Sequence, residues 1–236
     1  MTDVLIIGAG GIAFRHVEHL RAIDGVRIVG VCDIDRNRAE KWAGRANAPA
    51  FTDVEVALAA TKPDYVTILT PRGVRESLID LCIARNLPFL VEKPPCDRLS
   101  TGRRIQAKLS ASGLLHSVGF MHRWNESLDV VRAELQDEPI SVVTIRHTAP
   151  FALAPDFSAY PDPYLIERSG GLVGDQGIHY IDIARYVTGS EVEEIQAMGV
   201  NQRLPLSAHV TTRDVAWCGH RGCRYSGKCA IITHYE

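Results

Sequence analysis

The sequence predicts an α/β protein. A doubly wound parallel sheet is expected over residues 1–120, followed by an incomplete α+β domain with a mostly antiparallel sheet over residues 121–236. Three observations support this fold class. Short strands alternate with helical segments through the first half, which implies right-handed crossovers and parallel strands covered on both faces. The strands are apolar without gaps, as in YVTIL at residues 65–69, and a glycine-rich turn joins the first strand to the first helix.

The elements of the first half follow one another at short intervals. Strands are predicted within residues 4–7, 26–35, 64–71, 87–95 and 114–120, and helices within residues 12–20, 36–46, 74–86 and 99–113. The second half predicts a helix at residues 175–189, which Gly189 would stop, and sheet strands at residues 141–147 and 192–202.

The turn after the first strand has a G-x-G-x-x-A pattern, formed by Gly8, Gly10 and Ala13. In such a turn the first glycine permits a tight bend, the second lets the backbone approach a pyrophosphate, and the small third residue lets the helix pack closely on the strand. The helix then offers free N–H groups and the positive end of its dipole to phosphates. Asp33 ends the second strand about 20 residues later, as expected of a Rossmann dinucleotide-binding unit.

Asp33 also bears on the choice of cofactor. A carboxylate there accepts hydrogen bonds from the adenosine ribose hydroxyls and repels a 2′-phosphate, so we expect NAD in preference to NADP. Arg36 and Arg38 follow closely and could neutralise a 2′-phosphate, which keeps NADP as the alternative. Asp33 and Asp35 could also cap the following helix, and both roles can hold, one for each residue.

Lys93 lies in VEKPPCDRLS, residues 91–100, where an apolar strand runs into two prolines. The strand ends at the carboxyl edge of the sheet, where ligands of open α/β sheets bind. Pro94 favours an extended conformation for Lys93, and the bond between the two residues is a candidate for the cis form. From spacing alone, a lysine that snorkels from a strand end is favoured over one that acts at a nicotinamide.

Several ordered motifs resemble the Gfo/Idh/MocA oxidoreductase family, which includes glucose–fructose oxidoreductase and inositol dehydrogenase. The motifs are GAGGIA at residues 8–13, VCDID at 31–35, ILTP at 68–71, VEKP at 91–94, VGFMHRW at 118–124 and GGLVGDQGIHYID at 170–182. The similarity extends from residue 4 to about residue 200. The family continues with a large, mostly antiparallel sheet, and its members generally are longer than this chain.

The resemblance implies roles for individual residues. Lys93, His179 and Asp175 would be catalytic: Lys93 and His179 would manage the hydroxyl proton while a hydride leaves a carbinol carbon, and Asp175 would hold substrate and His179 in line. Lys93 would be a base only with a lowered pKa, and otherwise a hydrogen-bond donor. Arg123, Asp175 and His179 would contact substrate, although a salt bridge at a domain junction explains Arg123 equally well. The positions expected at the cofactor are Gly8, Gly10, Gly11, Ile12, Ala13, Asp33, Thr70, Pro71, Glu92 and Lys93.

The helix at residues 175–189 supports this reading through its own pattern. Asp175, His179 and Asp182 are spaced i, i+4 and i+7 and would share one face, with Ile178 and Ile181 on the other side with the core. An imidazole beside a carboxylate can transfer protons near neutral pH. A polar face that only forms hydrogen bonds is the alternative. A metal site is not favoured, because the sequence offers no third ligand in a matching context.

The loop after the third predicted strand departs from the family. Many relatives carry Asn and His there, whereas this chain has Arg72 and Arg75. An arginine pair could receive an anionic substrate or a 2′-phosphate, or it could simply belong to a solvated loop.

The end of the chain, residues 217–236, is a second departure. It is rich in Cys, Gly and basic residues, unlike everything before it. Cys218, Cys223 and Cys229 are spaced C-x4-C-x5-C, with His220 and His234 nearby, which does not match the usual zinc spacing. A truncated or frameshifted end is favoured over a zinc site, and it would expose a sheet edge and an apolar face.

The composition is that of an ordinary globular protein, 46% hydrophobic and 23% charged, with a formal net charge of −2. The lack of a basic excess argues against a nucleic-acid partner. No apolar run approaches the roughly 20 residues that span a bilayer, and no signal peptide is recognisable, so a cytoplasmic location is expected. The expected partners are a small-molecule substrate and further copies of the chain, provided that the second domain is complete enough to pair.

The family resemblance, together with the glycine turn and Asp33, implies an NAD(P)-dependent oxidoreductase that transfers a hydride between a nicotinamide cofactor and a hydroxyl carbon of a sugar- or cyclitol-like substrate. One alternative is a dinucleotide-binding protein without turnover, such as a regulator or a decayed paralogue. Another is a hydrolytic enzyme of the same family, for instance a glycoside hydrolase, that uses a bound NAD as a redox partner.

Overall fold

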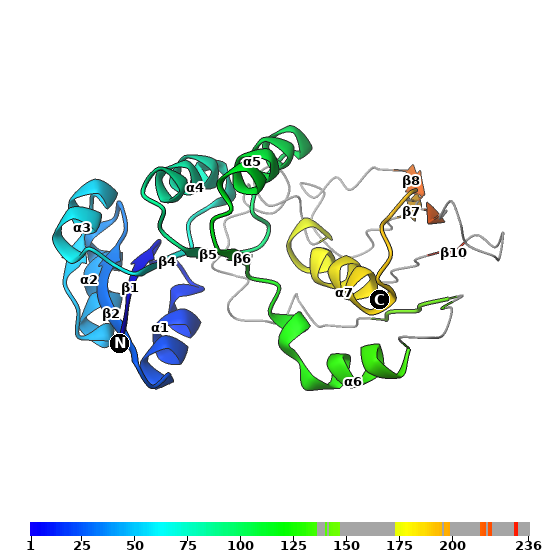
Figure 1. Cartoon of the computed structure of the whole chain (residues 1–236), viewed down its shortest axis with the longest axis horizontal. Helices are drawn as coiled ribbons and strands as arrows, with labels where there is room; N and C mark the ends of the chain where they lie inside the picture. The colour runs from blue at the N-terminus through cyan, green and yellow to red at the C-terminus, as the bar shows by residue number, and fades with distance from the viewer. Residues whose placement is uncertain are drawn as a thin grey trace, which may run out of the picture. The chain divides into compact units, whose positions relative to one another are not determined.

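The computed structural model describes residues 1–135, 140, 142–146, 173–194, 196–198, 213–215, 217–218 and 229–230. The chain divides into two compact units, Met1–Gly119 and Phe120–Glu236. Figure 1 shows the order of the elements within each unit. Within the described part of the chain, no helix is both long and apolar enough to cross a bilayer.

The first unit is built on a six-stranded sheet of parallel strands in the order β3-β2-β1-β4-β5-β6. Its strands are β1 (Thr2–Ile7), β2 (Val26–Cys32), β3 (Ala50–Phe51), β4 (Tyr65–Ile68), β5 (Phe89–Val91) and β6 (His116–Val118). The chain runs outward from β1 to β3 in one direction and from β4 to β6 in the other. The strand order therefore reverses between β1 and β4, which confirms the predicted doubly wound Rossmann fold.

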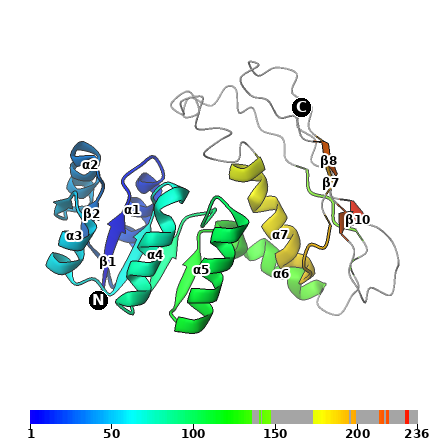
Figure 2. The same cartoon turned by 90° about the horizontal axis from the view of Figure 1, so that it is seen from above.

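Five helices cover the two faces of this sheet (Figure 2). They are α1 (Ala13–Ala22), α2 (Arg36–Ala46), α3 (Val54–Thr61), α4 (Arg75–Ala84) and α5 (Leu99–Ser112), and a short 3-10 helix, η1 (Arg72–Val74), precedes α4. The alternation of side chains along β1 separates two cores. Leu5 joins a core with residues of α3, α4 and α5, whereas Ile6 joins a second core with residues of α1 and α2. Both side chains are fully buried, and burying each contributes about 1.5–3 kcal/mol.

The helix ends follow ordinary capping chemistry. Asp35 Oδ1 accepts the backbone N–H of Asn37 at 2.9 Å at the start of α2. Asp53 Oδ1 accepts the N–H of Val56 at 2.9 Å at the start of α3. Gly113 ends α5 with a φ of 63°, a left-handed conformation that glycine adopts without strain. β3 and α3 were not predicted, since β3 has only two residues and the VEVALAAT of α3 shows little apolar periodicity.

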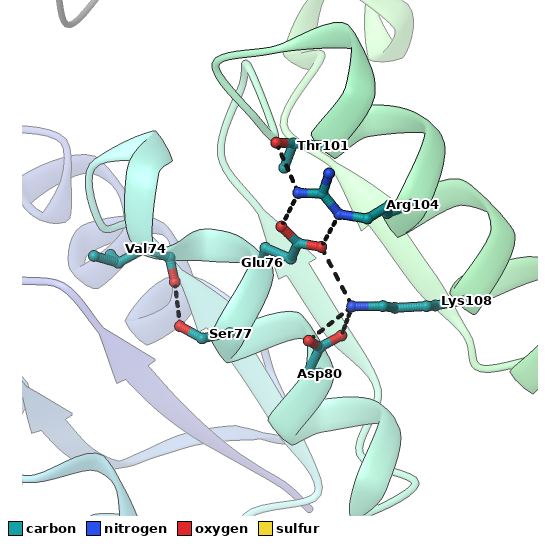
Figure 3. A network of polar contacts seen from close by, with 7 residues as sticks. All are labelled: Val74, Glu76, Ser77, Asp80, Thr101, Arg104 and Lys108. Atoms are coloured by element: carbon teal, nitrogen blue, oxygen red, sulfur yellow. Dashed lines mark hydrogen bonds and ion pairs between the residues drawn. The ribbon is translucent and has the colours of Figure 1, made fainter.

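Salt bridges join the outer surfaces of α4 and α5 (Figure 3). Glu76 accepts hydrogen bonds from Arg104 Nε at 2.9 Å and Nη2 at 2.7 Å. Lys108 donates to Asp80 Oδ1 at 2.7 Å and also contacts Glu76 at 3.3 Å. The hydrogen bond from Arg104, reinforced by Lys108, lowers the pKa of Glu76 to about 2. The network fixes the first turn of α4 against α5.

The second unit begins with a short 3-10 helix and continues into longer helices. Its elements are η2 (Met121–Trp124), α6 (Glu126–Glu134), the π-helical turn η6 (Val173–Gly177), α7 (Ile178–Thr188), β7 (Gln196–Met198), β8 (Arg213–Val215), β9 (Trp217–Cys218) and β10 (Cys229–Ala230). The strands β7 and β8 pair antiparallel, as do β9 and β10, in agreement with the predicted antiparallel character. The predicted strand at residues 192–202 contains β7.

Three features of this unit differ from what the sequence predicted. The helix predicted at residues 175–189 forms, and Gly189 ends it with a φ of 62°, but its first turn is π-helical. Residues 142–146, inside the predicted strand 141–147, belong to neither a helix nor a strand. The helix α6 was not predicted. Its N-cap is Asn125, whose side-chain oxygen accepts the N–H of Ser127 at 3.0 Å.

Candidate active site

The reversal of strand order places the exits of β1 and β4 side by side. The N–H of Leu69 donates to the carbonyl of Ile7 at 2.7 Å, and the N–H of Gly8 donates to the carbonyl of Cys32 at 2.8 Å. Gly8 has a φ of 101°, and a Cβ added to it would lie 2.7 Å from both Leu69 C and Thr70 N. Glycine is therefore required at this position for two reasons, its backbone conformation and the close approach of the neighbouring strand exit.

The turn that follows Gly8 leaves room for a ligand. A Cβ added to Gly10 or Gly11 would meet nothing within 4 Å. Ala13, by contrast, is fully buried in the core beneath α1. Among the described residues no side chain caps the start of α1, where Ile12 is the N-cap residue. Open glycines in front of an uncapped helix start fit the pyrophosphate of a dinucleotide.

Asp33 connects this turn to the end of β2. Its Oδ2 accepts the N–H of Ala9 at 2.7 Å, and its Oδ1 accepts the N–H of Asp35 at 2.9 Å and Nη2 of Arg38 at 3.0 Å. A carboxylate has about four acceptor sites, so these three bonds leave about one for a ribose hydroxyl. Asp35 caps α2, as the sequence allowed, and the ribose-binding role of Asp33 stays a prediction.

Lys93 follows β5 at the same edge of the sheet, and its peptide bond to Pro94 is cis, the form considered from the sequence. Its backbone N–H donates to Glu92 Oε2 at 3.1 Å. The other carboxylate oxygen of Glu92 lies 2.9 Å from Nε2 of His16, which α1 contributes. A Cβ added to Gly119 would come within 3.1 Å of the Glu92 carboxyl carbon. The segment that carries Lys93 is therefore held from two sides.

Arg75 corrects an expectation. The sequence offered a solvated loop or an anion site for Arg72 and Arg75, but the Arg75 side chain is buried, with 6% exposure. Its Nε and Nη2 donate to the carbonyl oxygen of Thr70 at 2.8 and 2.5 Å, and its Nη1 donates to the carbonyls of Glu92 and Pro94. Three backbone carbonyls therefore surround this guanidinium, which rules out the solvated-loop interpretation for Arg75.

The second unit holds the remaining predicted residues. His179 and Asp182, each 4% exposed, are the buried polar side chains of α7. The rings of His122 and His179 meet edge to face, with centroids 4.9 Å apart. Arg123 donates to Asp182 through Nε at 2.8 Å and Nη2 at 2.6 Å, and the bond to this carboxylate raises the pKa of Arg123. The salt-bridge alternative for Arg123 is thus present in the structure, within this unit.

The predicted face of α7 is only partly correct. His179 and Asp182 share a buried face, but Ile178 and Ile181, expected in the core, are only partly buried. Asp175 lies in the π-helical turn that precedes α7, so the predicted sharing of one face with His179 stays a prediction. The side chain of Asp175 lies outside the described residues.

The cysteine-rich end lies largely outside the described residues, so the absence of a metal site there stays a prediction. Cys218 and Cys229 are opposite each other in the β9–β10 pair. Cys223, His220 and His234 lie outside the described residues. Among the side chains that the structure describes, no cluster of three or more His, Cys, Asp or Glu residues could hold a metal ion.

Comparison with known proteins adds to this geometry. A family model described as an oxidoreductase family with an NAD-binding Rossmann fold matches residues 2–120, and the model of the Gfo/Idh/MocA C-terminal domain matches residues 139–221. The chain belongs to the Gfo/Idh/MocA family. The match reaches beyond residue 200, where the motifs were expected to end, and overlaps the start of segment 217–236.

Individual members of the Gfo/Idh/MocA family resemble the chain at moderate identity. An inositol 2-dehydrogenase from Rubrobacter xylanophilus is 28% identical over 87% of this chain and 57% of its own length. A D-apiose dehydrogenase from Paraburkholderia graminis is 30% identical over 78% of this chain and 49% of its own length. A putative myo-inositol dehydrogenase from Sinorhizobium meliloti superposes with a TM-score of 0.72 at 26% identity, over 85% of this chain and 60% of that one. The chain thus spans about half to three fifths of the length of these relatives.

The structure brings together most of the cofactor set that the family resemblance implied. Gly8 and Thr70 touch, Asp33 bonds to the glycine turn, and Glu92 and Lys93 lie on a segment tied to Thr70 through Arg75. Two features that hold these segments in place were not predicted. One is His16, which contacts Glu92. The other is the clamp that Arg75 forms with the carbonyl oxygens of Thr70, Glu92 and Pro94. Neither has a local sequence signal, because their partners are 76 residues away for His16 and up to 19 residues away for Arg75.

Proposed function

We propose that the chain is an NAD-dependent oxidoreductase that transfers a hydride between the nicotinamide and a hydroxyl carbon of a sugar- or cyclitol-like substrate. The observation that supports it most strongly is the single sheet edge in the first unit that carries the glycine turn, Asp33 and Lys93. The relatives named inositol 2-dehydrogenase and D-apiose dehydrogenase point to polyhydroxylated substrates. The chain covers only part of the length of those relatives, so both its activity and its substrate class are proposed.

Different residues would bind the cofactor and handle the substrate in this reaction. The N–H groups at the start of α1 bind the pyrophosphate, and Asp33 accepts a hydrogen bond from the adenosine ribose. Bound NAD⁺ supplies a hydride acceptor, so the alcohol carbon becomes a carbonyl and its hydroxyl proton must leave. Lys93 holds the substrate oxygen as a donor or takes its proton. Where Lys93 acts only as a donor, His179 accepts the hydroxyl proton, and Asp175 and Arg123 contact the substrate.

A turnover assay tests this function. The purified chain is mixed with NAD⁺ and a panel of inositols, aldoses and apiose, and the absorbance of the reduced nicotinamide is followed. We expect turnover with at least one polyol, and a loss of about 10²- to 10⁴-fold in kcat for Lys93→Ala. Lys41→Ala is the matched control, because Lys41 lies over the ring of Trp42 on the outside of α2. Full activity of Lys93→Ala would exclude the role of Lys93.

Dinucleotide binding without turnover is the second candidate. It is favoured by one observation: every described residue proposed to contact the cofactor lies in the first unit, so binding does not depend on α7. Tight NAD binding in titration calorimetry, with no turnover on any polyol, would select this candidate. Release of a sugar from a glycoside without net NADH formation would instead select a hydrolase that uses bound NAD.

Three lesser proposals accompany the main one. NAD is preferred over NADP, since the Asp33 carboxylate would repel a 2′-phosphate; comparing the two Kd values tests this preference. Further copies of the chain associate into a homo-oligomer, which light scattering tests. A cytoplasmic location is proposed from the sequence, and cell fractionation tests it.

A further inference from the structure

Arg75 joins two strand exits that the sequence separates. It is the first residue of α4, and its buried guanidinium donates to the carbonyl of Thr70 after β4 and to the carbonyls of Glu92 and Pro94 after β5. The two last carbonyls belong to the residues on either side of Lys93. A single planar cation thus fixes the backbone from which the Lys93 side chain departs.

The base of this clamp is itself immobilised. Glu76, the next residue along α4, is bound by Arg104 and Lys108 of α5 (Figure 3). Ile79, one turn further on the inner side of α4, is fully buried in the core against β4 and β5. The Cα of Arg75 is therefore held by contacts on both sides of α4, so its guanidinium transmits the position of α4 to the segment around Lys93.

The chemistry of the contacts distinguishes Arg75 from an ordinary surface arginine. Burying a cation costs free energy unless its donors are satisfied, and the fork of an arginine can satisfy several carbonyls in one plane. A lysine offers a single nitrogen and cannot bridge the carbonyls of Thr70 and Pro94 in the same way. The side chain is therefore suited to holding two loops together, and its depth excludes direct binding of a solvated anion.

We infer that Arg75 is a positioning residue, which acts through the Glu92–Lys93–Pro94 backbone to set the place of the Lys93 amine relative to the β4 exit. The inference rests on the proposed function, in which Lys93 handles the substrate hydroxyl. Reacting groups lose about 100-fold in rate when they are displaced by about 1 Å. Removing the clamp should therefore lower kcat for polyol oxidation by about 100-fold, with a smaller effect on NAD affinity.

A double-mutant cycle tests whether Arg75 acts through Lys93. Arg75→Met removes every donor and keeps an unbranched apolar stem, and the cycle combines it with Lys93→Ala. We expect Arg75→Met to lower kcat about 100-fold in the normal background and less than about threefold in the Lys93→Ala background, because coupled residues are not additive. Equal losses in the two backgrounds would overturn the inference.

Two further variants separate positioning from folding. Arg85→Met changes an exposed arginine at the other end of α4 that pairs with Glu55, and it should leave kcat within about twofold. Arg75→Lys keeps the charge and serves if Arg75→Met fails to fold. It should lose activity nearly as strongly as the methionine variant, since it cannot bridge the carbonyls. Normal kcat in Arg75→Lys would overturn the inference.

A spectroscopic measurement decides the matter even without turnover. Reductive ¹³C-methylation labels the lysine amines, and loss of one NMR signal in Lys93→Arg assigns Lys93. Arg75→Met or Arg75→Lys should shift that signal by more than its line width, whereas Arg85→Met should not. An unchanged Lys93 signal would overturn the inference. Absence of turnover in the unmutated chain with a shifted signal would refute the proposed function alone.

Discussion

Replacing Gly8 with alanine tests how closely the exits of β1 and β4 approach at the site. Gly8 has a φ of 101°, and the added Cβ would lie 2.7 Å from Leu69 C and from Thr70 N. Both are backbone atoms of the segment that directly follows β4, so they cannot rotate away as a side chain could. Gly25 provides the matched control, because its φ is 79° but its added Cβ would meet nothing within 4 Å.

The two variants differ in which energetic terms they incur. A left-handed conformation costs a residue with a Cβ about 1–2 kcal/mol. Forcing an extra carbon into a closely packed place adds about 1–3 kcal/mol. Gly25→Ala incurs only the first term, so its free energy of unfolding should fall by about 1–2 kcal/mol. Gly8→Ala incurs both, so its free energy of unfolding should fall by about 2–5 kcal/mol.

Urea titration followed by far-UV circular dichroism measures both changes. The comparison requires equal m-values, so that a shift in midpoint reports stability alone. Gly8→Ala should also weaken NAD binding, since the strand exits can separate only by distorting the glycine turn. A Gly8→Ala variant as stable as Gly25→Ala would refute the close approach of Thr70 to Gly8.

Three further predictions follow from the first unit. Asp35→Ala removes the cap of α2, so its free energy of unfolding in urea titration should fall by about 1 kcal/mol while its affinity for NAD is retained. Asp33→Ala should instead weaken NAD binding in calorimetry at least as much as it lowers stability. The reverse pattern would mean that the two aspartates have each other's role. The folded-state pKa of Glu76, about 2, lies below its ordinary value of 4.5 because Arg104 binds the carboxylate. The contribution of Glu76 to the free energy of unfolding is therefore present above pH 4.5 and lost as the pH falls towards 2. Glu76→Gln should flatten the fall in stability over that range, and an unchanged slope would contradict the pairing. Burial raises the pKa of Cys82 to about 12, so a thiol reagent at pH 8 should modify it only as fast as the unit unfolds, and rapid labelling under native conditions would disprove its burial.

The elements of the fold that could be predicted are those that leave a local signal in the sequence. Gapless apolar runs and helix stops such as Gly113 and Gly189 can be read from neighbouring residues, and they located the main strands and helices. The two-residue strand β3 and the alanine-rich α3 gave no periodic signal and were missed. The strand expected at residues 141–147 shows the opposite failure, since an apolar alternation at 142–146 does not pair with another strand in the described residues.

The predictability of the site depends on the same difference between local and long-range signals. The glycine turn and Asp33 follow β1 and β2 at the positions that the sequence predicted, because their spacing is a local signal, while their contacts with a cofactor stay a prediction. The difference between Asp33 and Asp35 required the structure, because both aspartates precede the same helix, and only their contacts show that Asp33 binds Ala9 while Asp35 caps α2. Arg75 was misjudged because a charged residue in a loop is usually solvated, and its acceptors are backbone carbonyls that leave no trace in the amino-acid types.

Titration of the chain with NAD⁺ by calorimetry tests the central claim most directly, when it is repeated with Gly10→Val. A Cβ added to Gly10 would meet nothing within 4 Å, so we expect this variant to fold normally. The claimed site predicts saturable binding of NAD⁺ by the unmutated chain and its loss in Gly10→Val, because the added side chain would fill the place of the pyrophosphate. Failure of the unmutated chain to bind NAD⁺, or equal affinity in both proteins, would contradict the account.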